Sequence, residues 1–444
     1  MAEPTFDAPP DPACGAALPQ VDGPVPGPEG RALVDLLARH ECPAITARRA
    51  RRSEQTGVGQ DPIVWERARG ANVWDADDNR FVDLTGGFGV ASVGHGHPAV
   101  VAAVSEQAAR LAHGLGDAFP ARRRIELAAA LAAWTPDPLE QVIFGSSGSE
   151  AVEAALKTAV VATGRGGVVA FEGGYHGMSL GALSASHYRE AFRRPFADRV
   201  GPLATWLPWG ASAGSVAAAL SEHRPAAVIV EPLQGRGGCR APAPGWLAML
   251  RGACDRADVL LIFDEIFTGF GRAGERVLSG TAAADGVVPD LLCLGKGLTS
   301  GYPLSACIGS VQVMSAWGAS QGESLHTSTF LGHPVGCAAA LAVIDLFEGG
   351  MLERARTLGE HMGSTLQTLA ERRPDRFGGV RGRGAMRGLE VRDGASMTLC
   401  RALLQRGYLL LPAGLEGEVL SFTPPLVTTR AQWDGAVDAL EACL

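Results

Sequence analysis

The middle of this chain repeats one pattern, in which a short apolar run ends in a polar or glycine-rich turn. Helix-like stretches such as "EAVEAALKTAV" and "PGWLAMLRGACDRA" lie between the runs. The runs with their turns are "QVIFGSSGSE", "GVVAFEGGYHG", "AAVIVEPLQG", "DVLLIFDEIF" and "DLLCLGKG". Buried strands that alternate with amphipathic helices are typical of a mostly parallel sheet with helices on both faces. The pattern therefore predicts an α/β fold.

Polar or reactive side chains follow each of these apolar runs. In a parallel sheet the carboxyl ends of the strands lie at one edge, and ligands bind there. We therefore expect a single site to gather the residues at these positions, which are Ser147, Ser149, Tyr175, His176, Glu231, Asp264 and Lys296.

The pattern changes on both sides of this region. Residues 1–30 carry eight prolines and four glycines with little apolar patterning, which predicts a disordered leader that is not a signal peptide. We assign residues 31–90 to an N-terminal segment that joins a small domain, and residues 91–340 to a large domain. Residues 341–444 begin with a long helical pattern and are predicted to form a small α+β C-terminal domain.

Charge and cysteine usage bear on partners and location. A net charge of −8 and a pI near 5.7 argue against nucleic acid and against an anionic membrane as main partners. No apolar run approaches the roughly 18 residues that a membrane helix needs. The nine cysteines are dispersed without a CxxC pair or metal-ligand spacing, so we expect reduced thiols, no metal site and a cytoplasmic location.

Lys296 is unusual because the chain contains only two lysines, Lys157 and Lys296, and otherwise uses arginine for positive charge. Codon bias explains part of this excess of arginine. An amine differs from a guanidinium, however, because it can lose its proton. Lys296 lies between two glycines directly after an apolar run, and this context makes it a candidate catalytic residue.

Other motifs allow two interpretations each. In "FGSSGSEAVEAALK" the first turn of a helix could bind a phosphate through its unpaired N–H groups, or Ser147 or Ser149 could be an ordinary N-cap. Asp264 could keep a ring nitrogen protonated, or it could be an ordinary acidic residue of a loop. Tyr175 could stack on a flat ring, or it could pack within its own turn. The hydroxyls of "LHTSTFLGHP" belong to a ligand site or to a capping loop.

Residues 269–274 match G-x-G-x-x-G, the pattern of a dinucleotide-binding turn. That fingerprint needs its glycines directly after a strand and a helix that begins at the third glycine. Here "DEIFT" intervenes and "ERVLSG" is a poor helix start, so we reject this interpretation.

A phosphate cradle, a stacking aromatic, a carboxylate for a ring nitrogen and a lysine together meet the requirements of pyridoxal phosphate (PLP). The order of the motifs resembles class III, fold type I, PLP-dependent aminotransferases, a family that includes ornithine and 4-aminobutyrate aminotransferases. The motifs are "GHGHP", "SSGSEAVEAALK", "YHG", "EPLQG", "DEIFTGFGR", "LGKGLTSGYPLSA", "HTSTFLGHP" and "TPPL". The resemblance covers residues 60–430 and implies a large PLP-binding domain with a mostly parallel seven-stranded sheet, plus a smaller α+β domain.

The resemblance also implies roles for single residues around the cofactor ring. Lys296 is expected to form the Schiff base with PLP, and Asp264 to pair with the pyridine nitrogen. Ile266 and Tyr175 are expected to pack on opposite faces of the ring.

The phosphate is expected to be bound by Gly148 and Ser149, with help from Thr329 of the neighbouring subunit. That arrangement implies a homodimer with shared active sites. The remaining expected cofactor contacts are Ser147, His176 and Glu231.

The substrate positions depart from the family pattern. Many relatives read "EPxQGEGG", and this chain has Arg236 at the acid position. Ornithine aminotransferase has an arginine before "FxPPL", and this chain has Ser421 there. In those relatives the arginine binds an α-carboxylate, and the glutamate holds that arginine away from the substrate when other donors bind. Both of these residues are different in this chain. Phe88 falls where relatives place a substrate-lining residue, and we predict all three residues as substrate contacts.

The resemblance implies an aminotransferase that moves an amino group from a terminal or side-chain amine, or an ω-amino acid, to a keto acid or aldehyde. A racemase or aminomutase on the same fold is the main alternative, and product analysis separates it because a racemase needs no keto acceptor. A nucleotide-binding oxidoreductase and a binding protein without catalysis are further alternatives, and Lys296 and Asp264 argue against both.

Overall fold

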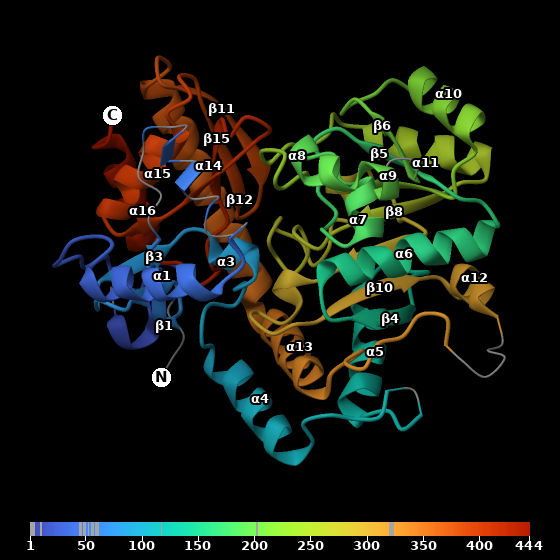
Figure 1. The fold of residues 1–444 in the computed structure, drawn as a ribbon, viewed down its shortest axis with the longest axis horizontal. Coiled ribbons are helices and arrows are strands. Elements are labelled where there is room, and N and C mark those ends of the chain that lie inside the picture. Colours follow the sequence, from blue (N-terminus) through green and yellow to red (C-terminus); the bar gives the residue numbers. More distant parts are fainter. Residues whose placement is uncertain are drawn as a thin grey trace. The chain divides into compact units, whose positions relative to one another are not determined.

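The computed structural model of this chain describes residues 5–8, 11–43, 62–116, 118–200, 203–318 and 324–444, with positions 47, 50, 51, 53, 54 and 57. The chain divides into two compact units (Figure 1). Unit 1 comprises Met1–His97 and Glu353–Leu444, and unit 2 comprises Pro98–Leu352. The predicted boundaries after residues 90 and 340 fall shortly before these divisions.

Unit 2 is built on a seven-stranded sheet with the order β4-β10-β9-β8-β7-β5-β6. β10 pairs antiparallel with β4 and β9, and the pairs among β9, β8, β7, β5 and β6 are parallel. This confirms the predicted α/β fold with a mostly parallel sheet. The strands are β4 (Gln141–Gly145), β5 (Val168–Phe171), β6 (Ala204–Leu207), β7 (Ala227–Val230), β8 (Leu260–Asp264), β9 (Leu291–Leu294) and β10 (Ser305–Gly309).

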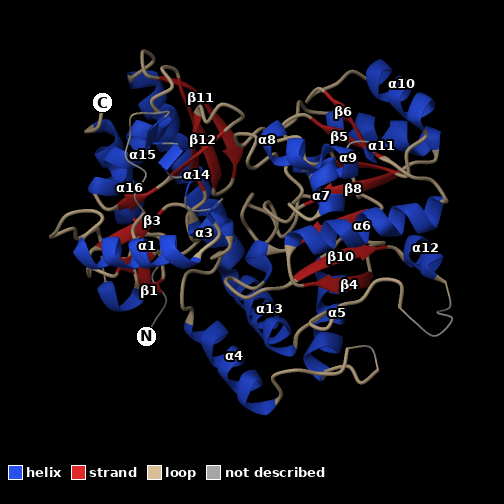
Figure 2. Cartoon of the chain, in the orientation of Figure 1, coloured by secondary structure: helices blue, strands red, loops and turns tan. Residues whose placement is uncertain are grey.

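The inner strands are apolar on both faces, so both faces need a cover of helices. β5, β7 and β9 are buried at every position. α6 (Gly148–Thr163) contributes Ala155 and Ala159 to the same core as Ile229 and Ile262, because small side chains allow a helix to approach a sheet closely. Figure 2 shows the helices of this unit around its strands.

The other helices of unit 2 precede these strands, connect them or follow the last of them. They are α4 (Pro98–Arg110), α5 (Arg122–Trp134), α7 (Leu180–Ala185), α8 (Glu190–Arg193), α9 (Ala197–Val200), α10 (Ala213–His223), α11 (Trp246–Ala257), α12 (Val311–Met314) and α13 (Pro334–Leu346).

Unit 1 contains two four-stranded sheets. One has the order β1-β2-β3-β13 and the other β11-β12-β15-β14. The strands are β1 (Trp65–Arg69), β2 (Asn72–Asp75), β3 (Arg80–Asp83), β11 (Phe377–Arg383), β12 (Met386–Val391), β13 (Tyr408–Leu409), β14 (Leu411–Ala413) and β15 (Val419–Phe422). The helices are α1 (Pro28–His40), α3 (Gly86–Gly89), α14 (Leu352–Arg372), α15 (Ser396–Gln405) and α16 (Arg430–Glu441).

The prediction of a disordered leader over residues 1–30 is wrong for its described part, and residues 1–4, 9 and 10 lie outside the described residues. Ala16 and Ala17 are buried, and the Ala17 N–H donates to Asn72 Oδ1 at 2.9 Å. Gln20 forms a β-bridge with Arg80, and Val25 packs in the core of unit 1. The buried residues of this segment come in short groups between exposed ones, such as Ala16 with Ala17, so no periodic pattern marks it.

One helical run, Pro334–Arg372, has an 18-residue window with a mean hydropathy of 1.7 and meets the length and composition of a membrane-spanning helix. Half of that window is buried inside the protein, as in a core helix of a globular domain. The run is interrupted by a π-helical turn, Phe347–Met351, in which Gly350 has φ 113°. By itself this run is weak support for a membrane segment.

Candidate active site

One pocket of about 210 Å³ in unit 2 gathers residues from the carboxyl ends of its strands. The Lys296 amine, the Asp264 carboxylate and the first turn of α6 all meet there. The lining residues are Ser147, Gly148, Ser149, Tyr175, His176, Gly177, Glu231, Arg236, Asp264, Ile266, Phe267 and Lys296. Every predicted cofactor residue except Thr329 is therefore in this one pocket.

The N-terminus of α6 forms one wall of the pocket. Ser147 is the N-cap, and its side chain accepts from the Glu150 N–H at 3.3 Å. The N–H groups of Gly148 and Ser149 have no protein partner in the described part of the chain, and both residues line the pocket. Ser147 is therefore an N-cap, and two N–H groups of the helix start still remain available to an anion, because capping satisfies only part of the helix start.

Close packing around this turn favours glycine at two positions. A Cβ at Gly148 would lie 3.0 Å from Ile266 Cγ2. A Cβ at Gly177 would lie 2.1 Å from Ser149 Oγ, and Gly177 also has φ 129°. Ser149 Oγ in turn accepts from the Met178 N–H at 3.0 Å, so the turn after Tyr175 is tied to the start of α6.

Asp264 ends β8 and is held at both carboxylate oxygens. His176 Nδ1 lies 2.8 Å from Oδ2, and the Ile266 N–H donates to Oδ1 at 3.1 Å. Both Asp264 and His176 are buried. Burial lowers the pKa of His176, but the hydrogen bond and the charge of Asp264 outweigh it, and the pKa is raised overall.

Lys296 follows β9 and has a left-handed backbone with φ 44°. Strain of this kind costs about 1–3 kcal/mol and gathers at functional sites. Burial is the main reason that the pKa of Lys296 falls from 10.5 to about 8. The charges of Asp264 and Glu231 raise this pKa but do not outweigh the effect of burial. The Nζ atom lies 4.2 Å from the centre of the Phe267 ring. A substantial fraction of this amine is therefore neutral near pH 8.

Glu231 follows β7 and joins two turns of the pocket. Its Oε1 accepts from the Tyr175 N–H at 2.9 Å and its Oε2 from the Gly235 N–H at 3.0 Å. Burial raises the pKa of Glu231 to about 7. Its contacts position the backbone of the Tyr175 and Arg236 turns.

Arg236 lies in the turn that Glu231 holds, and its side chain lines the pocket. The guanidinium carbon is 4.7 Å from the centre of the Tyr175 ring and 5.2 Å from that of Tyr188. Tyr188 meets Tyr175 edge to face at 6.2 Å. The Arg236 side chain is therefore directed along the pocket wall rather than toward open solvent.

Three predicted site residues lie elsewhere. Thr329 lines a small separate cavity of unit 2 with His113 and Arg124. Phe88 and Ser421 belong to unit 1, where Phe88 is 60% exposed and Ser421 lies on β15. The roles of all three residues remain predictions.

Two residues that line the pocket and one that contacts Arg236 were absent from the sequence-based set. Phe267, three positions after Asp264, could have been found from its place beside the strand end. Gly177 could have been found from the "YHG" motif, in which a glycine follows the aromatic pair. Tyr188 has no such signal, because it follows a short helix and only the folded chain brings it to Arg236.

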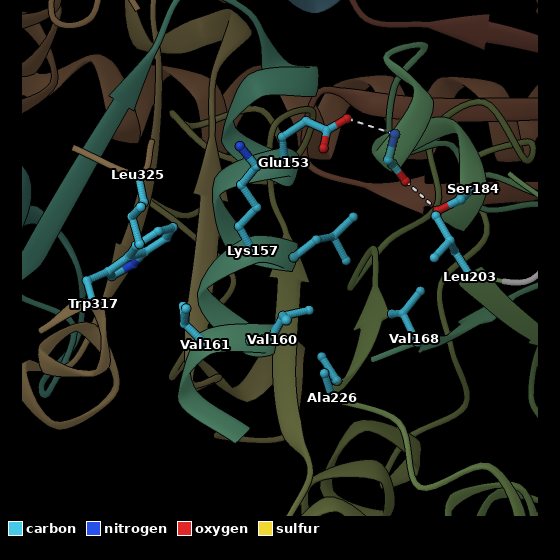
Figure 3. Close-up of a pocket in the computed structure, with 15 residues that line it drawn as sticks. Glu153, Lys157, Val160, Val161, Val168, Ser184, Leu203, Ala226, Trp317 and Leu325 are labelled. Atoms are coloured by element: carbon cyan, nitrogen blue, oxygen red, sulfur yellow. Dashed lines mark hydrogen bonds between the residues drawn. The ribbon is translucent and has the colours of Figure 1, made fainter. Parts of the chain in front are cut away.

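A second cavity, of about 390 Å³, lies beside α6 and is lined mostly by apolar side chains (Figure 3). Val160 and Leu203 line it, with Glu153 and Lys157 among the few polar residues. The Glu153 carboxylate accepts from the Gly181 N–H at 2.8 Å and so serves the start of α7. None of the predicted site residues lines this cavity, which is distinct from the candidate active site.

The family model for "Aminotransferase class-III" matches residues 54–444. An acetylornithine aminotransferase from Methanosarcina mazei is 38% identical over 384 residues, which are 86% of this chain and 92% of that protein. A 4-aminobutyrate aminotransferase from Mycobacterium tuberculosis is 37% identical over 434 residues, covering 90% and 94%. The PLP-bound structure of an amine transaminase from an uncultivated Pseudomonas species superposes with a TM-score of 0.79 at 31% identity, covering 86% and 95%.

Proposed function

Because this chain belongs to the class III aminotransferase family, we propose that it moves an amino group from a terminal amine or ω-amino acid to a keto acid or aldehyde. The chain is a PLP-dependent aminotransferase by its family and by its structural neighbours. The relatives named above act on acetylornithine and on 4-aminobutyrate, and this is the support for the donor class. The observation that carries the proposal is the meeting of Lys296, Asp264 and the start of α6 in one pocket.

The residues of the pocket fit PLP. The N–H groups of Gly148 and Ser149 suit the phosphate, and a larger residue at position 148 would fill the space near Ile266. The buried Asp264 carboxylate would hold the ring nitrogen, and Ile266 and Tyr175 would pack against the ring. When bound, the cofactor supplies an electron sink for the bond that breaks at the substrate carbon.

Lys296 is proposed to carry the cofactor and to move the proton. Its Nζ takes the proton from the carbon that bears the substrate nitrogen and returns it during product formation. A pKa of about 8 suits both halves of this task, because the amine can be neutral as a base and protonated as an acid near that pH.

Asp264 and His176 hold charge in place. The Asp264 carboxylate is fixed by His176 and by the Ile266 N–H, and it would keep the ring nitrogen of bound PLP protonated. Glu231 keeps the Tyr175 turn against the turn that carries Arg236. The Asp264, His176 and Glu231 side chains are buried, so water is largely excluded from the side of the pocket that they form.

We also propose a homodimer with shared active sites. Thr329 lies outside the pocket of its own chain, which is consistent with the expectation that it serves the neighbouring subunit. Large apolar side chains are exposed around this region, notably Phe119 at 74%, Leu325 at 70% and Phe330 at 57%. A second copy of the chain would cover such side chains.

Small-molecule donors and acceptors are the proposed partners, without nucleic acid or membrane, since the net charge of −8 is unfavourable for both polyanions. A cytoplasmic location is proposed because the nine cysteines are all free thiols, as expected in a reducing compartment.

The function can be tested on the purified enzyme. Borohydride reduction and peptide mapping should place the cofactor on Lys296 rather than Lys157. A panel of amines and ω-amino acids against pyruvate, 2-oxoglutarate and simple aldehydes should then give transfer that depends on an acceptor. Protein without PLP, or label on a residue other than Lys296, would contradict the proposal. Inversion of an amino acid without any acceptor would favour the racemase.

A further inference from the structure

Arg236 is presented to the pocket by a turn that has little freedom. The Gly235 N–H donates to Glu231 Oε2 at 3.0 Å, and Gln234 and Arg240 pair through both of their backbone hydrogen bonds at 3.0 Å. A Cβ at Gly237 would lie 2.6 Å from Gln234 Oε1. The backbone on both sides of Arg236 is therefore fixed, and so is the origin of its side chain.

The guanidinium group is held by two aromatic rings. It lies over Tyr175 at 4.7 Å and over Tyr188 at 5.2 Å, measured from the guanidinium carbon to the ring centres. The planar face of arginine stacks on aromatic rings, and its N–H groups then remain at the edge of the plane. The two tyrosine rings are at 89° to each other, so the guanidinium plane can stack on only one of them, and no hydrogen bond from its N–H groups to the described part of the chain is present.

No carboxylate lies within ion-pair distance of Arg236 in the described part of the chain. The two acids of the pocket have other partners: Glu231 accepts from two backbone N–H groups, and Asp264 accepts from His176 and from the Ile266 N–H. Burial dominates the lowered pKa of Lys296, but the positive charge of Arg236 adds to it, so Arg236 is within electrostatic reach of the amine.

We infer that Arg236 binds the carboxylate of the amino acceptor and makes this site selective for 2-oxo acids over uncharged aldehydes. The inference deepens the proposed function and rests on it. Arginine presents a rigid pair of N–H donors that match the two oxygens of a carboxylate. A partly buried guanidinium beside the catalytic amine, oriented by rings and lacking an acid of its own, has the geometry for this contact.

The cofactor phosphate is a second anion that a cation in this pocket could bind. The start of α6 already supplies N–H groups for that phosphate, which is why the substrate carboxylate is assigned to Arg236. The two sources are separated by measuring PLP affinity of the apoenzyme alongside acceptor kinetics of the holoenzyme.

The test compares Arg236→Gln, which removes the charge, with Arg236→Lys, which keeps the charge and loses the planar fork. The KM for a 2-oxo acid should rise about 10- to 100-fold in Arg236→Gln, and less in Arg236→Lys. The KM for an uncharged aldehyde should stay within about twofold, and the PLP dissociation constant should not change. Arg67→Gln is the control, since Arg67 also lies over an aromatic ring, Trp74, but is an exposed residue of β1.

Variants of Tyr188 give an independent test, because Tyr188 is proposed to position Arg236. Tyr188→Leu should raise the KM for the 2-oxo acid with little effect on the aldehyde, and Tyr188→Phe should keep the wild-type value because the ring is retained. Equal effects of Arg236→Gln on both acceptors, no effect on either, or a weakened PLP affinity would each overturn the assignment. Wild-type enzyme that transfers to neither acceptor would instead contradict the proposed function itself.

Discussion

His176 Nδ1 lies 2.8 Å from Asp264 Oδ2, and both side chains are buried. The Ile266 N–H holds the other oxygen of the same carboxylate. The orientation of Asp264 is therefore set by two partners on neighbouring parts of the pocket. If His176 acts only by orienting Asp264, replacing His176 should lower activity only while Asp264 is present.

Asp264→Asn should lower the rate of amino transfer by about 10²-fold or more, because a fixed charge opposite a reacting group commonly contributes that much. His176→Asn should cause a smaller loss, and the double variant should be no slower than Asp264→Asn alone. A double-mutant cycle on kcat/KM measures this, with melting temperatures to confirm folding. Losses that add on a logarithmic scale would mean that His176 acts independently of Asp264.

The chain offers an unusually clean test of the Lys296 amine, because its only other lysine is Lys157. Only the neutral amine is nucleophilic, and burial lowers the pKa of Lys296 to about 8. Acylation of Lys296 in the apoenzyme should therefore fall about tenfold for each pH unit below 8 and level off above it. Mass spectrometry of the two labelled peptides across pH 6 to 10 gives the profile, with Lys157 as internal reference. A Lys296 rate that still rises steeply above pH 9 would contradict the lowered pKa.

Gly177→Ala should weaken PLP binding, since the new Cβ would lie 2.1 Å from Ser149 Oγ and the backbone has φ 129°. Gly164→Ala is the matched control, because Gly164 at the other end of α6 has φ 65° with no atom within 4 Å of its Cβ. The control carries backbone strain of about 1–3 kcal/mol without the clash. Titration of both apoenzymes with PLP should show a raised dissociation constant for Gly177→Ala alone, and equal constants would remove Ser149 from the phosphate site.

Phe88 sits in a turn with a left-handed backbone at Gly86, Gly87, Phe88 and Gly89. The buried Asp83 carboxylate holds this turn, accepting from the N–H groups of Thr85, Gly86 and Gly87. We predict that Phe88→Ala changes the order of preference among amine donors and leaves the melting temperature nearly unchanged, because Phe88 is 60% exposed. An unchanged donor profile would exclude Phe88 as a substrate contact.

The sheet of unit 2 could be predicted from the sequence because each inner strand is an apolar run that ends in a turn. The same logic placed Tyr175, Glu231, Asp264 and Lys296 at one edge, since the carboxyl ends of parallel strands meet there. Where a strand is a clear apolar run that ends in a turn, the sequence is sufficient to place the residue that follows the strand.

Other features depend on contacts between distant segments. The packing of Ala16 and Ala17 beside Asn72 has no periodic signature, so proline and glycine content suggested disorder where the chain is ordered. The placement of Arg236 against Tyr188 needs the turn after β7 and the segment after α7 to meet in space. A family motif locates the backbone of Arg236, but only the folded chain reveals where the guanidinium points.

If Lys296 moves the proton during amino transfer, the turnover of Lys296→Ala shows it most directly. General acid–base catalysis contributes about 10²–10⁴-fold, so multiple-turnover transfer should fall by at least that factor. Non-covalent PLP binding should persist, because Gly148 and Ser149 are untouched. Lys157→Arg should behave like the wild type. Transfer by Lys296→Ala at near the wild-type rate would contradict this role of Lys296.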